Sequence, residues 1–198
     1  MNAKKTNIVL TGVGGQGVIT AANILGKAAV NAKKNVFVSE VHGMAQRGGS
    51  VICTVRIGDV SSALVPTGKA DIIVSTEPIE ALRYIKYANK DTKIIADINP
   101  VVPYTVSVGG EKYPDINEVF KEIETHAKLI KINALKIAND AGARITKNIV
   151  MLGALSAADI LPFKKEILMD TIIDSFPKKY IEINKKAFQE GYNAIKNS

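Results

Sequence analysis

The sequence predicts an α/β fold: a mixed, mostly parallel sheet between two layers of helices (three-layer α/β/α), followed by a helical C-terminal region. Short apolar, β-branched runs alternate with segments of helical apolar spacing over residues 7–141, as expected for a layered α/β sheet. From residue 146 onward the spacing is helical throughout. We expect the 198 residues to form a single domain, with the helices of residues 146–198 packed on it.

The first predicted unit is a strand, a glycine loop and a helix, as in a Rossmann-like β–α–β unit. Residues 7–11 are a buried strand by composition, and residues 18–30 have helical spacing. The loop between them reads Gly12-Val-Gly-Gly-Gln-Gly17. The start of a helix has unpaired N–H groups and positive dipole character, so this loop is predicted to bind a phosphate or another anion.

The glycines and Gln16 of this loop are the predicted cofactor-binding residues. Gly12 permits a tight turn, and Gly17 lets the helix pack closely against the strand. Gly14 and Gly15 let backbone N–H groups approach a ligand without a Cβ in the way, and Gln16 lies between them and the helix. The alternative is that the glycines only accommodate a cramped turn.

A second strand is predicted over residues 35–39, ending at Glu40. An acidic residue at this place binds a ribose hydroxyl in dinucleotide-binding folds. These residues alone therefore leave NAD or FAD binding open.

Residues 41–50 have the composition of a loop and carry many hydrogen-bonding groups. His42, Gln46 and Arg47 lie within six residues and precede Gly48 and Gly49. Arginine offers a planar, permanently charged donor for carboxylate or phosphate. The segment is predicted either to contact a ligand or to form a turn at a subunit interface.

The remaining elements follow from the same patterns of spacing and capping. Further strands or extended segments are expected at residues 50–58, 61–65, 69–75, 92–97, 101–108 and 128–132. Further helices are expected at 78–88 (N-capped by Thr76), from Asp115 through Ile123, at 134–141 (closed by Gly142), and at 147–158, 163–175 and 179–196.

Composition excludes several classes of site. The one cysteine, Cys53, lies in an apolar run and is expected to be buried, and with only two histidines we expect no metal site. The net charge of +7 comes mostly from dispersed lysines with few aromatic residues, which disfavours nucleic-acid binding. There is no run of eighteen apolar residues and no apolar leader, so we expect a cytoplasmic protein that does not enter the membrane.

The two glycine segments together resemble a known family. Gly12-Val-Gly-Gly-Gln-Gly17, followed by Ser39-Glu-Val-His-Gly-Met-Ala-Gln-Arg-Gly-Gly-Ser50, is similar to the gamma-type domain of 2-oxoacid:ferredoxin oxidoreductases. The long second string is most similar to the beta subunits of the indolepyruvate enzymes, and Thr76-Glu-Pro-Ile-Glu-Ala-Leu82 also matches their pattern. The resemblance covers essentially the whole chain.

This resemblance implies a subunit of a heteromeric enzyme that oxidatively decarboxylates arylpyruvates. Coenzyme A is the co-substrate, arylacetyl-CoA and carbon dioxide are the products, and ferredoxin receives the electrons. Thiamine diphosphate, Mg²⁺ and the iron–sulfur clusters are expected in an alpha subunit, and no cofactor is expected on this chain alone. The isolated chain, which has no expected catalytic residue, should be inactive.

The resemblance also changes the expected role of single residues. The loop of residues 12–17 would bind a phosphate of coenzyme A or press against the partner subunit. Glu40 would hold Arg47 in place rather than bind a ribose. The alternatives left open are a subunit acting on pyruvate, 2-oxoglutarate or branched 2-oxoacids, and a free-standing NAD- or FAD-binding protein.

Overall fold

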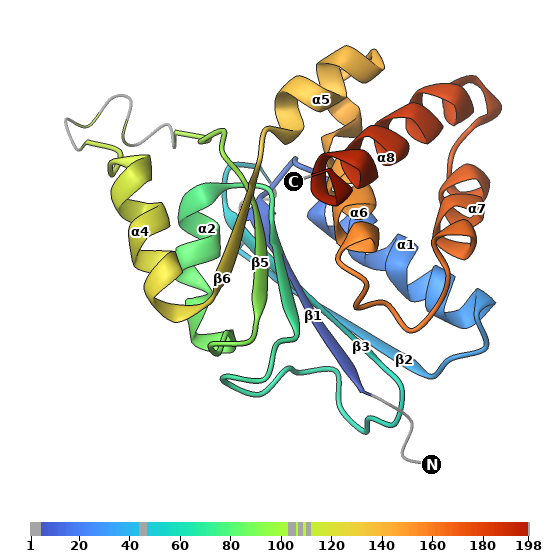
Figure 1. Cartoon of the computed structure of the whole chain (residues 1–198), viewed down its shortest axis with the longest axis horizontal. Coiled ribbons are helices and arrows are strands. Elements are labelled where there is room, and N and C mark those ends of the chain that lie inside the picture. Colours follow the sequence, from blue (N-terminus) through green and yellow to red (C-terminus); the bar gives the residue numbers. More distant parts are fainter. Residues whose placement is uncertain (1–4, 44–46, 103–105, 107–108, 110–111, 198) are drawn as a thin grey trace.

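The computed structural model describes residues 5–43, 47–102, 106, 109 and 112–197. Its sheet contains six strands, and helices cover both of its faces (Figure 1). The strands are β1 (Thr6–Val13), β2 (Val36–His42), β3 (Ser50–Ile57), β4 (Ile72–Ser75), β5 (Lys93–Asp97) and β6 (Lys128–Ile132). The helices are α1 (Val18–Asn31), α2 (Pro78–Arg83), α4 (Ile116–His126), α5 (Ala134–Ala141), α6 (Lys147–Ala157), α7 (Lys165–Ser175) and α8 (Ile181–Lys196).

The strand order is β2-β3-β1-β4-β5-β6. Strands β1, β4, β5 and β6 pair in parallel, whereas β3 pairs antiparallel with both β1 and β2. The prediction of a mixed, mostly parallel sheet is therefore confirmed. The β1–α1–β2 crossover is present, but β3 is inserted between the two strands that it joins.

Two hydrophobic clusters hold the layers together. Helices α2 and α4 lie on one face of the sheet, and α1, α6, α7 and α8 lie on the other (Figure 1). The larger cluster joins α1 and the C-terminal helices to the sheet around Ile8, Leu25 and Leu152, all at most 1% exposed. The smaller cluster lies under α2 and α4 around Ile73 and Ile123.

The C-terminal helices cross at very short range. Helices α6 and α8 meet at Gly153 and Gly191, where a Cβ would lie 2.0 Å from the Phe188 carbonyl oxygen and 2.1 Å from the Val150 carbonyl oxygen, respectively. Glycine is required at both positions because any side chain would collide with backbone rather than with a flexible side chain. This crossing packs the predicted helical region onto α1 and the sheet.

The second strand is longer than predicted. Strand β2 continues through Glu40 to His42, and its register with β3 pairs Val36 with Ile57 and His42 with Val51. The predicted loop of residues 41–50 is therefore only the end of a long β-hairpin. Strand formation extends this far because each added residue gains a partner on β3.

Three other expectations need correction. Residues 61–65 form no strand, and Thr76 is not the helix cap. Helix α2 is capped by Glu77, whose side chain accepts from the Glu80 N–H at 2.9 Å, and it ends at Arg83 rather than at residue 88. Much of the extended segment predicted at 101–108 lies outside the described residues.

The other predicted boundaries agree with the structure to within three residues; the largest differences are the start of β4 at Ile72 and the end of α4 at His126. Asp115 caps α4 by accepting from the N–H groups of Asn117 and Glu118. Gly142 closes α5 with a φ of 124°. Within the described ranges, the helices are too short or too polar to cross a membrane.

Candidate functional site

The two glycine segments meet at the carboxyl end of β1. The Gly14 N–H donates to the Gly49 carbonyl at 2.8 Å, and the Gly48 N–H donates to the Gly14 carbonyl at 3.2 Å. These bonds continue the β1–β3 ladder beyond the last paired residues of the strands. The resemblance drawn from two separate strings therefore corresponds to one site.

Gln16 holds the glycine loop in place. Its Oε1 accepts from the Val13 N–H at 2.8 Å and from the Thr76 hydroxyl at 2.6 Å, and its Nε2 donates to the Thr76 carbonyl at 3.2 Å. These bonds connect the loop to the end of β4. The Gln16 amide is thus directed into the protein and does not face the cleft described below.

This arrangement packs the glycine loop tightly against the end of β4. In open α/β sheets the ligand-binding crevice lies outside the carboxyl ends of the strands, where the strand order reverses. Here the reversal lies beside β1, and a Cβ at Gly12 would come within 1.9 Å of Thr76 Oγ1 and 2.8 Å of Gln16 Oε1. The close packing of Gly12, Gln16 and Thr76 closes the space directly between the ends of β1 and β4, and the open space lies instead between α1 and β2.

The start of α1 is suited to an anion. Its N-cap is Gly17, with a φ of 78°, no side chain caps the helix, and its first turn contains no acidic residue. The N–H groups of an uncapped first turn and the helix dipole favour negative charge. Gly17 also packs against Asn148 of α6, where a Cβ would lie 2.7 Å from Nδ2.

A cleft of about 510 Å³ opens beside this helix start, between it and the hairpin. The cleft is lined by Val13, Gly14, Gly15, Gly17, Val18, Ile19, Thr20, Glu40, His42 and Val51. Glu40 and His42 reach it from alternate positions of β2, which place their side chains on one face of the strand. Five of the eleven predicted site residues therefore line one cleft: Gly14, Gly15, Gly17, Glu40 and His42.

Arg47 lies in the turn between the hairpin strands and is exposed. The ion pairs formed by the described residues do not include one between Arg47 and Glu40, so the predicted holding role of Glu40 has no support here. Glu40 instead lies opposite Cys53 in the β2–β3 register. Gln46 lies outside the described residues.

A second polar cluster lies behind the turn, and the sequence patterns did not single it out as a site. Glu77 is the N-cap of α2 and is 2% exposed, and Glu80 lies in the first turn of the helix and is 5% exposed. Glu80 accepts from the Ser50 hydroxyl, and Glu77 accepts from the Tyr113 hydroxyl. Burial, followed by the bond to Glu77, raises the pKa of Tyr113, so this phenol remains a donor.

An ion pair closes the carboxyl edge of the sheet between β5 and α6. Lys147 Nζ lies 2.9 Å from Asp97 Oδ2 and donates to the Thr76 carbonyl at 2.9 Å. Asp97 is fully buried and also accepts from the Ala134 N–H at 3.1 Å. Because each charged group has several partners, the network stabilises the edge without leaving an unpaired buried charge.

No cluster of three or more histidine, cysteine or acidic side chains suited to a metal ion occurs within the described ranges. Cys53 is 1% exposed, which confirms the predicted burial of the thiol. Burial, with a smaller contribution from the Glu40 carboxylate, raises the pKa of the thiol to about 12. The thiol is therefore protonated and unsuited to metal ligation or nucleophilic attack.

Comparison with known proteins places this arrangement in a family. The family model for pyruvate ferredoxin/flavodoxin oxidoreductase matches residues 7–194. The chain belongs to this family. The match spans the glycine loop, the hairpin and the C-terminal helices alike.

Two relatives indicate the branch of the family. The indolepyruvate oxidoreductase subunit IorB of Thermococcus kodakarensis is 47% identical over 98% of this chain and 97% of its own length. The 2-oxoglutarate synthase subunit KorC of Methanocaldococcus jannaschii is 32% identical over 97% of this chain and 95% of its own. The higher identity confirms the predicted resemblance to the indolepyruvate-type subunits over the full length.

Two solved structures share the fold. The pyruvate oxidoreductase subunit PORC of Thermotoga maritima has a TM-score of 0.73 and 26% identity, over 96% of both chains. The 2-oxoglutarate:ferredoxin oxidoreductase of Magnetococcus marinus, solved with 2-oxoglutarate, coenzyme A and succinyl-CoA bound, has a TM-score of 0.75 and 22% identity. That match covers 98% of this chain and 32% of the longer one.

Proposed function

We propose that this chain is the non-catalytic subunit of an arylpyruvate:ferredoxin oxidoreductase and that its cleft binds a phosphate of coenzyme A. The complex converts an arylpyruvate and coenzyme A to arylacetyl-CoA and carbon dioxide and passes two electrons to ferredoxin. Its second subunit holds thiamine diphosphate with Mg²⁺ and the iron–sulfur clusters. When bound there, thiamine diphosphate supplies the carbanion stabilisation that decarboxylation needs.

The observation that carries the ligand proposal is the convergence of both glycine segments on one cleft at an uncapped helix start. A helix N-terminus without an acidic residue favours a phosphate. The Magnetococcus marinus enzyme, which has a domain of this fold, was solved with coenzyme A bound. Coenzyme A carries phosphates on a long flexible body, and an open cleft of about 510 Å³ suits part of such a ligand.

The chemistry of each residue around the cleft suggests its role in binding the ligand. In this proposal the N–H groups at the start of α1, beside Gly15 and Gly17, face a phosphate. Arg47 is exposed in the hairpin turn and does not line the cleft, and its long side chain would extend from the turn to add a positive charge. His42 is exposed on the cleft side of β2 and offers a ring nitrogen for a hydrogen bond. The one cysteine of the chain is too few for an iron–sulfur cluster, which supports the assignment of the clusters to the partner.

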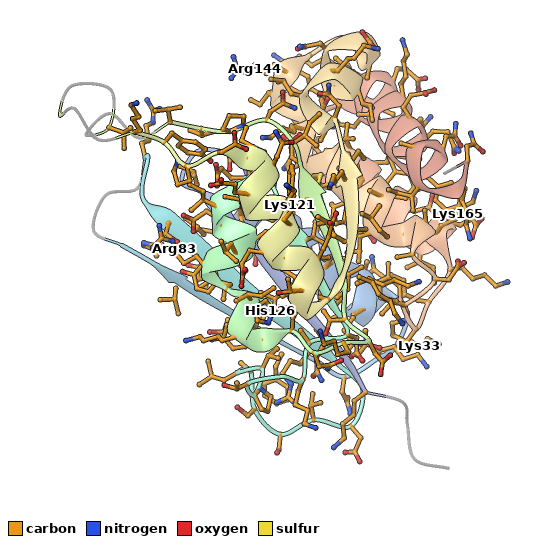
Figure 2. All side chains as sticks on the ribbon, turned by 60° about the vertical axis from the view of Figure 1, so that its left-hand side comes forward. Lys33, Arg83, Lys121, His126, Arg144 and Lys165 are labelled. Carbon is orange, nitrogen blue, oxygen red and sulfur yellow. The ribbon has the colours of Figure 1, made fainter. Side chains whose placement is uncertain are left out.

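Replacing Arg47 tests this proposal. In the assembled complex, Arg47→Ala is expected to raise the KM for coenzyme A about tenfold to a hundredfold, the range for loss of a charge-assisted hydrogen bond. Thiamine diphosphate and iron contents should not change. Arg144→Ala, at an exposed arginine outside the cleft, serves as the control (Figure 2). An unchanged KM for coenzyme A in Arg47→Ala would remove Arg47 from the ligand site.

A second role for the hairpin is supported by its apolar surface. Strand β2 forms an edge of the sheet, and Phe37 and Val41 are 41% and 59% exposed on the face opposite the cleft. An unpaired, apolar edge strand is suited to contact with another chain. If the hairpin, including its turn, serves mainly to contact the partner subunit, Arg47→Ala weakens binding of that subunit and leaves the KM for coenzyme A unchanged.

A further inference from the structure

The two glycines that follow Arg47 do little to restrict the backbone conformation of the turn. Arg47 is followed by two glycines, Gly48 has a φ of 78°, and a Cβ there would meet nothing within 4 Å. Consecutive glycines have the greatest backbone freedom of any residues. The position of Arg47 relative to the cleft therefore depends on the contacts that fix both ends of the glycine pair.

One of these contacts is the backbone pairing with Gly14 described above, and the other is made by Ser50. Ser50 is the first residue after the glycines and the first residue of β3. Its hydroxyl donates to Glu80 Oε2, and its oxygen lies 3.0 Å from the Tyr84 hydroxyl, which is free to donate to it. Ser50 thus fixes the hairpin turn to α2, on the other side of the sheet from the cleft.

Glu80 is itself held so that it keeps this position. Its Oε1 accepts from Arg83 Nε at 3.0 Å, and its backbone N–H donates to Glu77 Oε2 at 2.9 Å. The Arg83 side chain is 55% exposed, whereas that of its partner Glu80 is 6% exposed, so the carboxylate is the buried member of the pair. A buried carboxylate whose two oxygens both have partners is a rigid anchor.

Glu77, which accepts from the Glu80 N–H, also holds the chain that leads towards α4. Glu77 Oε1 accepts from the Tyr113 hydroxyl and from the Val101 N–H, the latter at 3.4 Å. Burying two carboxylates is costly, and an apolar helix start would fill this space at lower cost. The arrangement is therefore better explained by a need to fix these segments than by the stability of α2 alone.

We propose that Glu80 is a positioning residue for the ligand site: through Ser50 it fixes the Arg47–Gly49 turn beside the cleft. Glu80 does not touch the ligand. It fixes the Gly49 carbonyl, which accepts from the Gly14 N–H. The distance between the hairpin turn and the glycine loop is therefore held constant. This role rests on the proposed function, because it acts on the ligand that Arg47 and the glycine loop bind.

The test uses the assembled complex and measures initial rates at varied coenzyme A. Ser50→Ala removes the anchor without emptying a buried carboxylate site, and Ser50→Thr keeps the hydroxyl. Thr54→Val is the matched control, since Thr54 lies on the same strand and its hydroxyl makes one comparable bond, to the Ala63 carbonyl at 2.7 Å, away from the cleft. Glu80→Gln keeps the shape and one acceptor oxygen.

Ser50→Ala is expected to raise the KM for coenzyme A about threefold to tenfold, with kcat changed less than the KM. Ser50→Thr and Glu80→Gln should lie closer to the unmodified protein, and Thr54→Val should stay within about twofold of it. Combined with Arg47→Ala, Ser50→Ala should have no further effect on the KM, because the two residues act through one contact. A purely structural role for Ser50 would not produce this dependence on Arg47.

Two results would overturn the proposal in different ways. If Arg47→Ala raises the KM but Ser50→Ala does not, or if their effects are independent, the positioning role alone is wrong. If Arg47→Ala leaves the KM unchanged, the ligand role of Arg47 fails first and the positioning role fails with it.

Discussion

Gln16 shows how a single side chain decides what the glycine loop can do. Its amide bonds to Val13 and Thr76 place the loop against β4, so that the open space beside the loop lies on its other side, towards β2. Nothing in the local sequence indicates this, because Thr76 is 60 residues away. The glycine spacing predicts a strand–loop–helix unit, but the partner of the Gln16 side chain decides where a ligand can enter.

Removing this amide should loosen the loop. Gln16→Ala is expected to lower the free energy of unfolding by about 1–3 kcal/mol, since the Val13 N–H and the Thr76 hydroxyl lose their shared acceptor. Gln189→Ala is the control, because the Gln189 amide donates to Asn193 Oδ1 one turn further along α8 and does not join two elements. Urea unfolding of both variants measures the change in the free energy of unfolding. Equal decreases in the two variants would mean that the Gln16 bonds stabilise the protein no more than a bond within one helix.

Cys53 gives a prediction about pH. A thiol with a pKa of about 12 has a thiolate fraction of about one in 10⁴ at pH 8, and only the thiolate is alkylated readily. Because the folded pKa lies above that of an exposed thiol, labelling by iodoacetamide should become fast near pH 9 only after unfolding. Mass spectrometry of native and urea-unfolded samples measures this. Rapid labelling of the native protein at pH 8 would show that Cys53 is not buried.

At the scale of elements, the local patterns predict the structure well. The runs that form β1, β4, β5 and β6 are each identified by apolar, β-branched residues, and Asp115 and Gly142 mark helix ends by their own chemistry. The cap of α2 is displaced by one residue from Thr76 to Glu77. Pro78 opens the helix, a residue before proline is extended, and Glu77 has a φ of −154°, so Glu77 is the cap.

The elements whose position depends on distant partners are the ones that the sequence does not place. Strand β3 inserts between β1 and β2, and this pairing extends β2 to His42 and brings Gly48 and Gly49 to Gly14. No periodicity in the sequence encodes the partner of a strand. The two glycine segments could thus be identified from the sequence, but the cleft between α1 and β2 could not.

The crossing of α6 and α8 can be tested with two substitutions. Gly153→Ala and Gly191→Ala each place a Cβ about 2 Å from a carbonyl oxygen of the other helix, so each should lower the free energy of unfolding by at least about 1–3 kcal/mol. Gly43→Ala, where a Cβ meets nothing within 4 Å, is the control. Thermal unfolding measures the differences, and a stable Gly153→Ala variant would mean that the helices are farther apart.

At the scale of the whole molecule, the chain has the features of a subunit. It has a cleft at one end of the sheet, an edge strand with exposed apolar side chains beside that cleft, and a single, buried cysteine. Members of its family with similar length are named as subunits of oxidoreductases. Among the described residues, no group of three or more histidine, cysteine or acidic side chains suited to a metal ion occurs.

The central claim is that this chain contributes a binding surface to an enzyme whose redox centres lie in another subunit. The most direct test is an assay of ferredoxin reduction with indolepyruvate and coenzyme A, using this chain alone, the thiamine-containing subunit alone, and both purified together after co-expression. The account predicts activity that needs coenzyme A and appears only when both chains are present. Full activity of the thiamine-containing subunit alone, or activity of this chain alone, would contradict it.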